Sequence, residues 1–244
     1  MKFLKSLFSP PREAHCEFGR PAPLSPLAAI GDIHGRADLL EQLLARLEPD
    51  LQVICVGDYI DRGDRSADVL RILHSSSDII CLKGNHEEMM LNFLEQPETY
   101  GRRWFRNGGL QTMASFGIAG LTQTSSDDRL RTVRDALVKA MGDPLIDWLD
   151  GLQSGWRVGN LAVVHAGADP ALPLEAQPGH VLRWGHPDFM TTPRSDGVWV
   201  IHGHTIVSTP VMDQGRVAID TGAYASGRLT AAVVTDGDIH FETT

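Results

Sequence analysis

Six residues of types that commonly bind divalent metals follow strand-like runs in this 244-residue chain. Their types, in chain order, are Asp, His, Asp, Asn, His and His: Asp32, His34, Asp58, Asn85, His165 and one of His202 and His204. Carboxylate, amide and imidazole ligands in this mixture suit a pair of divalent first-row metals that share one carboxylate. The ordered set indicates metal-assisted hydrolysis of phosphoesters.

The first ligands lie in two glycine-bounded motifs, GDIHG (31–35) and GDYIDRG (57–63). Alternate side chains of an extended chain point to the same side, so Asp32 and His34 can reach one ion. The alternative is a simple turn with a surface histidine. Asp58 is the natural bridge between two ions, because it has two oxygens and a central place in the order. Asn85, in GNHE (84–87), offers a neutral oxygen.

Three neighbouring residues are predicted to act on the substrate. His86 cannot easily face the same ion as Asn85, so we predict that it is the general acid that protonates the departing alkoxide. Asp61 is expected to orient this imidazole. Arg62 offers a forked set of donors for two phosphate oxygens. Glu87 falls in the first turn of a helix, where its charge is favourable, and is therefore at least partly structural.

The last ligands are histidines at the ends of later strand-like runs. His165 follows the run 161–164, while His202 and His204 both stand in the segment IHGHT. Spacing alone does not separate these two. Asp220 is expected either to support a ligand histidine or to belong to a glycine-rich turn, and Tyr224 is placed where it can touch substrate.

The elements that must position these residues alternate between strand-like runs and helical patterns. Short apolar runs at 27–30, 51–56 and 79–82 each end at a motif, and helical spacing is seen at 37–47 and about 66–75. This pattern predicts parallel β-α-β units with functional loops at the carboxyl ends of the strands. Residues 88–152 are expected to be mostly helical, with a turn region at 104–109. The later strands, 161–164, 199–201, 217–219 and 230–235, are expected to be antiparallel and linked by hairpins.

Composition places the chain among ordinary globular proteins and sets limits on its partners. The net charge of −9 argues against nucleic acid as the main partner. Three cysteines without framework spacing fit a reducing cytoplasm. No stretch of 18 apolar residues is present, so no membrane span is expected. Residues 1–26 hold five of the 14 prolines and are predicted to form an arm before a single catalytic α/β domain at 27–244.

Together the motifs resemble the phosphoprotein phosphatase branch of the calcineurin-like metallophosphoesterases, especially the bacterial and lambda-phage-type serine/threonine phosphatases. The likeness covers about residues 27–235 and depends on GDIHG, GDYIDRG, GNHE, VVHAG, HGHT and IDTG followed by GRLT. It implies a β-sandwich flanked by helices, with the metal site at the carboxyl ends of strands.

The resemblance also implies a role for each site residue. One metal would be bound by Asp32, His34 and Asp58, and the other by Asp58, Asn85, His165 and His204, which favours His204 over His202. His86 would be the acid, Asp61 its orienting partner and Arg62 a phosphate clamp, with Asn85 also touching phosphate. The expected metals are two divalent ions, manganese first, with iron and zinc as alternatives.

The chain departs from the family pattern at two places where substrate phosphate is bound. Lys83 stands where relatives commonly have arginine, which keeps the charge but loses the fork. A second arginine, two residues after a tryptophan in relatives, is replaced by His186, while Arg183 precedes the tryptophan. Lys83, Arg183 and His186 are therefore predicted phosphate contacts, and either of the last two can serve in place of the missing arginine.

Three functions are consistent with the sequence. The leading hypothesis is hydrolysis of phosphomonoesters, expected to be phosphoserine and phosphothreonine in proteins, by direct attack of a hydroxide that bridges two metals. The second is symmetrical cleavage of diadenosine tetraphosphate, for which the segment 104–109 would stack a base or only pack. The third is a catalytically silent scaffold, which predicts the loss of a ligand or of the acid. Neither the physiological substrate nor the oligomeric state follows from the sequence.

Overall fold

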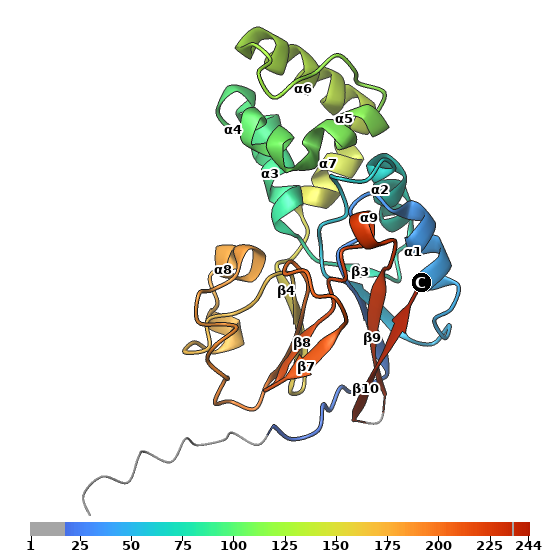
Figure 1. Cartoon of the computed structure of the whole chain (residues 1–244), viewed down its shortest axis with the longest axis vertical. Helices are drawn as coiled ribbons and strands as arrows, with labels where there is room; N and C mark the ends of the chain where they lie inside the picture. The colour runs from blue at the N-terminus through green and yellow to red at the C-terminus, as the bar shows by residue number, and fades with distance from the viewer. Residues whose placement is uncertain (1–17, 236) are drawn as a thin grey trace, which may run out of the picture.

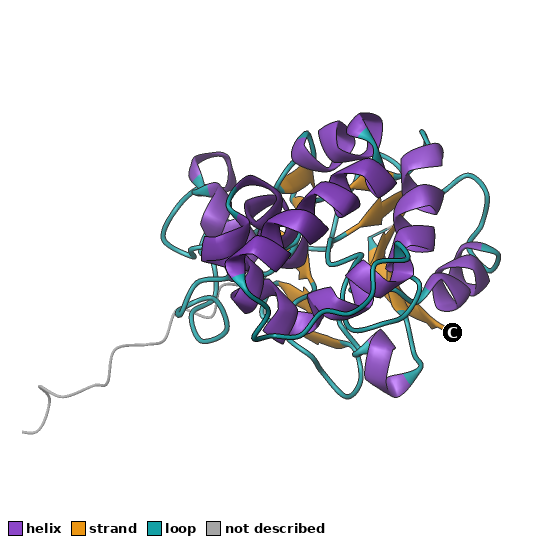
Figure 2. Cartoon of the chain, turned by 90° about the horizontal axis from the view of Figure 1, so that it is seen from above, coloured by secondary structure: helices purple, strands orange, loops and turns teal. Residues whose placement is uncertain are grey.

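Two five-stranded sheets pack against each other, and a group of helices lies at one end of them (Figure 1). The computed structural model describes residues 18–235 and 237–244. The predicted arm at 1–26 therefore lies mostly outside the described residues. Seen from the helical end, the helices cover much of the strands (Figure 2).

The first sheet carries the earliest motifs. Its order is β10-β9-β1-β2-β3, with bounds Asp238–Thr243, Thr230–Thr235, Leu27–Ile30, Gln52–Cys55 and Ile80–Cys81. Strands β1, β2 and β3 are parallel, and β9 and β10 run antiparallel beside them. The crossovers contain α1 (Ala37–Leu44) and α2 (Ser66–Ser75), so the predicted β-α-β units are confirmed. Both helices bury one apolar face, as their leucine spacing predicts.

The second sheet carries the later histidines. Its order is β4-β5-β6-β8-β7, with bounds Gly155–Val158, Leu161–Val164, Trp199–His202, Arg216–Ala218 and Val211–Asp213. The hairpins β7–β8 and β9–β10 are antiparallel, as expected. However, β5, β6 and β8 are parallel to one another, so the expectation of purely antiparallel later strands is wrong. Long connections join these three strands, and such connections allow parallel pairing where a short turn does not.

Apolar side chains fill the space between the sheets and a second region under the helices. The inner faces of the sheets contribute one cluster of buried residues: Leu27, Ala29, Ile54, Val56, Leu82, Leu161, Val163, Ile201, Val217, Ile219, Ala232 and Val234. Cys55 and Cys81, adjacent partners on β2 and β3, are free and buried, as expected of small apolar residues. Strands that are buried on both faces are thereby held rigidly, and so are the loops that follow them.

Residues 85–150 form the helical segment, which contains α3 (Asn85–Glu95), α4 (Pro97–Trp104), α5 (Leu110–Ser115), α6 (Asp127–Met141) and α7 (Asp143–Asp150). Where a turn region was predicted, the stretch Phe105–Gly109 joins α4 to α5 across a kink, with Gly108 in a non-helical conformation at a φ of 111°. The loop before α6 ends at Ser126, whose side chain caps that helix by accepting from the Arg129 N–H. Two shorter helices, α8 (Gly179–Trp184) and α9 (Ala223–Ser226), lie in the second half of the chain.

The described residues before β1 run beside the second sheet. Asn160 accepts a hydrogen bond from the Ala22 N–H at 2.7 Å and donates to the Arg20 carbonyl, while the Trp199 indole donates to the Gly19 carbonyl. None of the helices in the described ranges combines the length and hydropathy that crossing a bilayer requires.

Candidate active site

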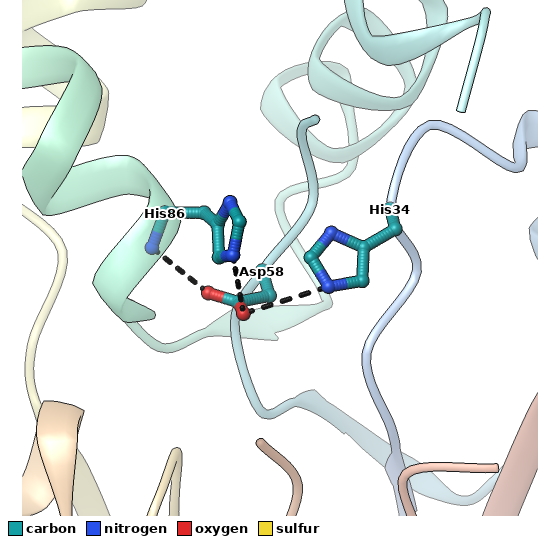
Figure 3. Close-up of side chains that lie close together, drawn as sticks. All are labelled: His34, Asp58 and His86. Atoms are coloured by element: carbon teal, nitrogen blue, oxygen red, sulfur yellow. Dashed lines mark hydrogen bonds and ion pairs between the residues drawn. The ribbon is translucent and has the colours of Figure 1, made fainter. Parts of the chain in front are cut away.

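The carboxylate of Asp58 lies at the centre of the site, between imidazoles that come from three other loops. Its Oδ2 is 3.7 Å from the Nε2 of His34 and 3.7 Å from the Nε2 of His86 (Figure 3). Its Oδ1 is 3.3 Å from the Nε2 of His165. One buried carboxylate thus faces nitrogen atoms on two sides, as expected of a ligand that two ions share.

Asn85 brings the later histidines together. Its Oδ1 lies 2.9 Å from the His165 Nε2 and 2.8 Å from the His204 Nδ1. Asp58, His165 and His204 also offer ligand atoms within 4.8 Å of one another. By contrast, the Nδ1 of His202 lies 3.1 Å from the Gly203 carbonyl oxygen and its ring packs on Phe189, which places it outside this group.

Asp32 meets the loop after β6 from the first sheet. Both of its oxygens accept from the His204 backbone N–H, at 3.1 and 3.0 Å. Gly203 is required for this approach, since a Cβ there would lie 1.9 Å from the Asp32 Oδ1. The last predicted ligand of the second sheet and the first of the first sheet are therefore in direct contact.

His34 has a fixed orientation toward the site. Its Nδ1 lies 2.7 Å from the Ile60 carbonyl oxygen, so the proton is on Nδ1 and the Nε2 lone pair faces Asp58. Hydrogen bonding of the distal ring nitrogen is the usual support for a metal-binding histidine. Burial lowers the pKa of His34 to about 3, which keeps this ring neutral and able to bind a cation.

Strained backbone is concentrated at these loops. Outside glycine, positive φ occurs among the described residues at His34, Asp58, Asp61, Arg62, His204 and Gln214, and all but the last belong to the site. Such conformations are unfavourable for residues with a Cβ and persist only where the surroundings enforce them. The motif loops are thus held in shapes that present side chains toward one point.

The carboxylate of Glu87 enforces part of this geometry. It accepts backbone N–H groups of Asp58 at 2.8 Å, Tyr59 at 2.8 Å and Gly84 at 2.9 Å. Three charge-assisted hydrogen bonds tie the loop after β2 to the loop after β3. The predicted structural role of Glu87 is therefore confirmed, and its partners are the loops that carry Asp58 and Asn85.

The acid candidate His86 belongs to a buried network. Its Nδ1 lies 2.6 Å from Asp61, a fully buried carboxylate. Asp61 also accepts from the Trp104 indole at 2.9 Å and from the Thr112 hydroxyl at 2.6 Å. Neither Trp104 nor Thr112 was predicted to support Asp61, because nothing in the spacing links them to it. Trp104 has no exposed surface, so it packs and does not stack a base.

Arg62 lies next to the imidazole of His86. Its Nη2 is 3.3 Å from the His86 Nε2, and its guanidinium carbon is 4.8 Å above the ring of Tyr224. Tyr224 in turn packs edge-on against His34, with ring centroids 5.4 Å apart. Arg62 therefore contacts both His86 and Tyr224, beside Asp58.

The remaining predicted residues, Lys83, Arg183, His186 and Asp220, bond to residues other than the predicted metal ligands. Lys83 donates to the Asp150 carbonyl at 2.8 Å, and Arg183 pairs with Glu88 and donates to Ser154. The Nε2 of His186 is 3.7 Å from Asp169. The Asp220 carboxylate accepts from the Gly222 N–H at 2.8 Å, within a turn.

The donor set fits divalent cations. Among the described residues no lysine or arginine forms an ion pair with Asp32 or Asp58, although both are buried. Burial, and then the neighbouring Asp220, raises the pKa of Asp32 well above its ordinary value, so its charged form lacks compensation. Burial also lowers the pKa of His204 to about 4. Buried carboxylates beside imidazoles are the environment that a metal cation stabilises.

Comparison with known proteins identifies the family. The model of the calcineurin-like phosphoesterases matches residues 25–208. The chain belongs to this family. It is thus a metal-dependent phosphoric ester hydrolase, and the sequence-based recognition is confirmed.

Relatives differ in the substrate that their names give. A serine/threonine-protein phosphatase 2 from Escherichia coli is 43% identical over 83 residues, which cover 33% of this chain and 37% of that protein. An asymmetrical bis(5′-nucleosyl)-tetraphosphatase from Bacillus velezensis is 27% identical over 229 residues, which cover 82% of this chain and 86% of that protein. Sequence identity to the phosphatase is higher, but that alignment covers about a third of each chain. The alignment with the tetraphosphatase covers most of both chains.

Solved structures support the fold. A protein proposed to be a diadenosine tetraphosphatase aligns over 90% of this chain and 93% of its own, with a TM-score of 0.62 at 18% identity. A metallophosphoesterase from Sphaerobacter thermophilus aligns over 90% of this chain and 88% of its own, with a TM-score of 0.52 at 17% identity. The predicted metallophosphoesterase sandwich with flanking helices is confirmed.

Proposed function

We propose that this enzyme hydrolyses phosphomonoesters by direct transfer of the phosphoryl group to water. The observation that carries the proposal is the position of His86. This imidazole is paired with a buried carboxylate and directed at Asp58, 3.7 Å away, where two metal ions would meet. It is therefore placed to give a proton to the oxygen that leaves phosphorus.

The residues divide into two ligand groups. We assign Asp32, His34 and Asp58 to one divalent ion and Asp58, Asn85, His165 and His204 to the other. When bound, the ions would lower the pKa of water and stabilise charge on the phosphoryl oxygens. Manganese is the expected ion because mixed oxygen and nitrogen ligands suit it, and iron or zinc would suit the same shell.

The remaining charge on phosphate is met by protein donors. Arg62 presents a guanidinium beside His86, 3.3 Å from its Nε2, and can hold two phosphoryl oxygens. We assign Asn85 as a second phosphate contact, through its amide nitrogen. Asp61 holds the His86 ring in place and stabilises the imidazolium before the proton is transferred.

The stereochemistry at phosphorus tests direct transfer. A phosphomonoester made chiral with oxygen isotopes is hydrolysed by the manganese-loaded enzyme, and the product configuration is determined. Direct attack by water inverts phosphorus. Retention, or radioactive phosphate remaining on acid-quenched protein, would show two successive displacements and would refute the mechanism.

For the substrate we propose phosphoserine and phosphothreonine in proteins. Cleavage of dinucleoside tetraphosphates is the second candidate, favoured by the likeness over 82% of the chain to a protein named for that substrate. Turnover of phosphopeptides, p-nitrophenyl phosphate and diadenosine tetraphosphate separates the two. The nucleotide products also distinguish symmetrical cleavage (two ADP) from asymmetrical cleavage (AMP and ATP).

A further inference from the structure

A cavity of about 480 Å³ is lined by Arg62, the neighbour of the catalytic acid, and the mechanism above uses no other residue of its lining. Its walls come from three parts of the chain, the GDYIDRG loop, the segment from α4 to α6 and α9: Arg62, Phe105, Arg106, Asn107, Gly108, Leu110, Gln111, Gln123 and Tyr224. The helical segment, the loop after β2 and α9 thus enclose it together.

The charge of this cavity is opposite to that of the molecule. Two arginines and three amide side chains line it without any carboxylate, although the chain has 31 acidic residues and a net charge of −9. Within the described ranges, neither Arg62 nor Arg106 forms an ion pair with a carboxylate, whereas the nearby Arg102 pairs with Asp127. Unneutralised arginines in a hollow attract anions.

The cavity and the catalytic acid share a neighbouring residue. Arg62 connects the two places, because its side chain reaches the His86 Nε2 at 3.3 Å and its backbone N–H donates to the Gly108 carbonyl. Gly108 is needed there, since a Cβ would lie 2.6 Å from the Arg62 nitrogen. Arg62, which contacts the catalytic acid, and Tyr224, on which it packs, therefore both line the cavity.

We propose that this cavity receives the leaving group and selects leaving groups that carry a second phosphate, with Arg106 as the residue that binds it. The inference rests on the proposed phosphoester hydrolysis. Tyr224, Phe105 and Leu110 offer apolar surface for the spacer between the phosphates, and the amides supply further donors.

A matched series of substrates tests this selection. The kcat/KM of the manganese-loaded enzyme is measured on alkanediol bisphosphates with two to six carbons and on the corresponding hydroxyalkyl monophosphates. We expect a preference of about tenfold for one spacer length, since a hydrogen-bonded charge pair at a partly exposed site is worth about that much. Arg106→Gln should bring the ratio close to one.

Arg103→Gln is the matched control. Arg103 lies three residues earlier and is also exposed, but its guanidinium stacks 4.8 Å above Trp184 and does not line the cavity. This variant should keep the preference of the wild type. Equal kcat/KM for both substrates at every spacer length, or a preference that survives Arg106→Gln, would overturn the proposal.

Binding separates this proposal from the proposed function. Calorimetry with alkane bisphosphonates and monophosphonates should give about tenfold tighter binding of the bisphosphonate, lost in Arg106→Gln. If no phosphoester is hydrolysed but this difference is found, the proposed function fails and the anion site stands. If substrates are hydrolysed without discrimination and the two ligands bind equally, only the anion site fails. The kcat/KM for diadenosine tetraphosphate and for doubly phosphorylated peptides is then measured with the wild type and with Arg106→Gln. The substrate whose kcat/KM falls in the variant identifies the source of the second phosphate.

Discussion

The loops at the sheet ends and the helical segment 85–150 contribute to the active site by different physical means. Asp32, Asp58, His165 and His204 follow strands whose pairing fixes their backbone, and three of these four stand in loops with strained φ angles. In contrast, Trp104 and Thr112 act on Asp61 through their side chains: both donate to its carboxylate, and the Thr112 hydroxyl also accepts from its backbone N–H. Asn85 and His86 begin α3 and join the two regions.

This contrast separates two functions of the site. The sheet loops gather the ligands, so damage there should remove metal and affect every substrate alike. The helical segment orients the acid, so damage there should matter in proportion to how much the leaving group needs a proton. Metal content and leaving-group dependence are therefore the two measurements that distinguish the regions.

The largest expected effect is at the shared carboxylate. Asp58→Asn removes the charge that both ions would use, and kcat should fall at least about a thousandfold because metal assistance supplies several kcal/mol. Metal content, measured by mass spectrometry of the dialysed protein, should fall below two ions per chain. Asp135→Asn, on an exposed face of α6, is the control and should keep both ions. Full activity with two bound ions in Asp58→Asn would contradict the ligand assignment.

Loss of the acid should depend on the leaving group. His86→Asn should lower kcat about 10²–10⁴-fold for alkyl phosphates, which need protonation, and much less for p-nitrophenyl phosphate, whose anion is stable. Metal content should remain near that of the wild type, since we assign the ring of His86 to no ion. An equal loss for both substrates would show instead that His86 supports the metal site.

A smaller effect of the same kind is expected from the residues that support Asp61. Thr112→Val keeps the shape but removes a buried donor at 2.6 Å, which should cost about tenfold in kcat for alkyl phosphates. Thr132→Val, at an exposed hydroxyl of α6, is the matched control. Combined with His86→Asn, the change at Thr112 should have little further effect, because both act through one proton. Additive losses would show that Thr112 acts elsewhere.

The two regions also differ in how far the sequence predicts them. The strands, the helices α1 and α2 and the ligand motifs follow from local patterns, since each motif comes directly after an apolar run and parallel strand ends meet at one edge. The support of Asp61 by Trp104 does not, because 43 residues separate them and ordinary core packing explains the tryptophan equally well. The parallel pairing of β5, β6 and β8 was missed because it depends on long connections, which leave no periodic signal.

The smallest effect is expected at a contact between the helical segment and α8, away from the predicted metal ligands. Glu88 of α3 accepts from the Trp184 indole at 3.0 Å and pairs with Arg183, so α8 is tied to the helical segment. Arg183→Gln should lower the unfolding free energy by about 1 kcal/mol, a shift in Tm of about 2–4 °C, because it removes the charge that pairs with Glu88 and the hydrogen bond to Ser154. KM for phosphopeptides should stay within about twofold, since an arginine held by Glu88 would have to break that pair to reach phosphate. A large rise in KM at unchanged Tm would instead make Arg183 a further phosphate contact besides Arg62 and Asn85, and the contact between α3 and α8 would then belong to the active site.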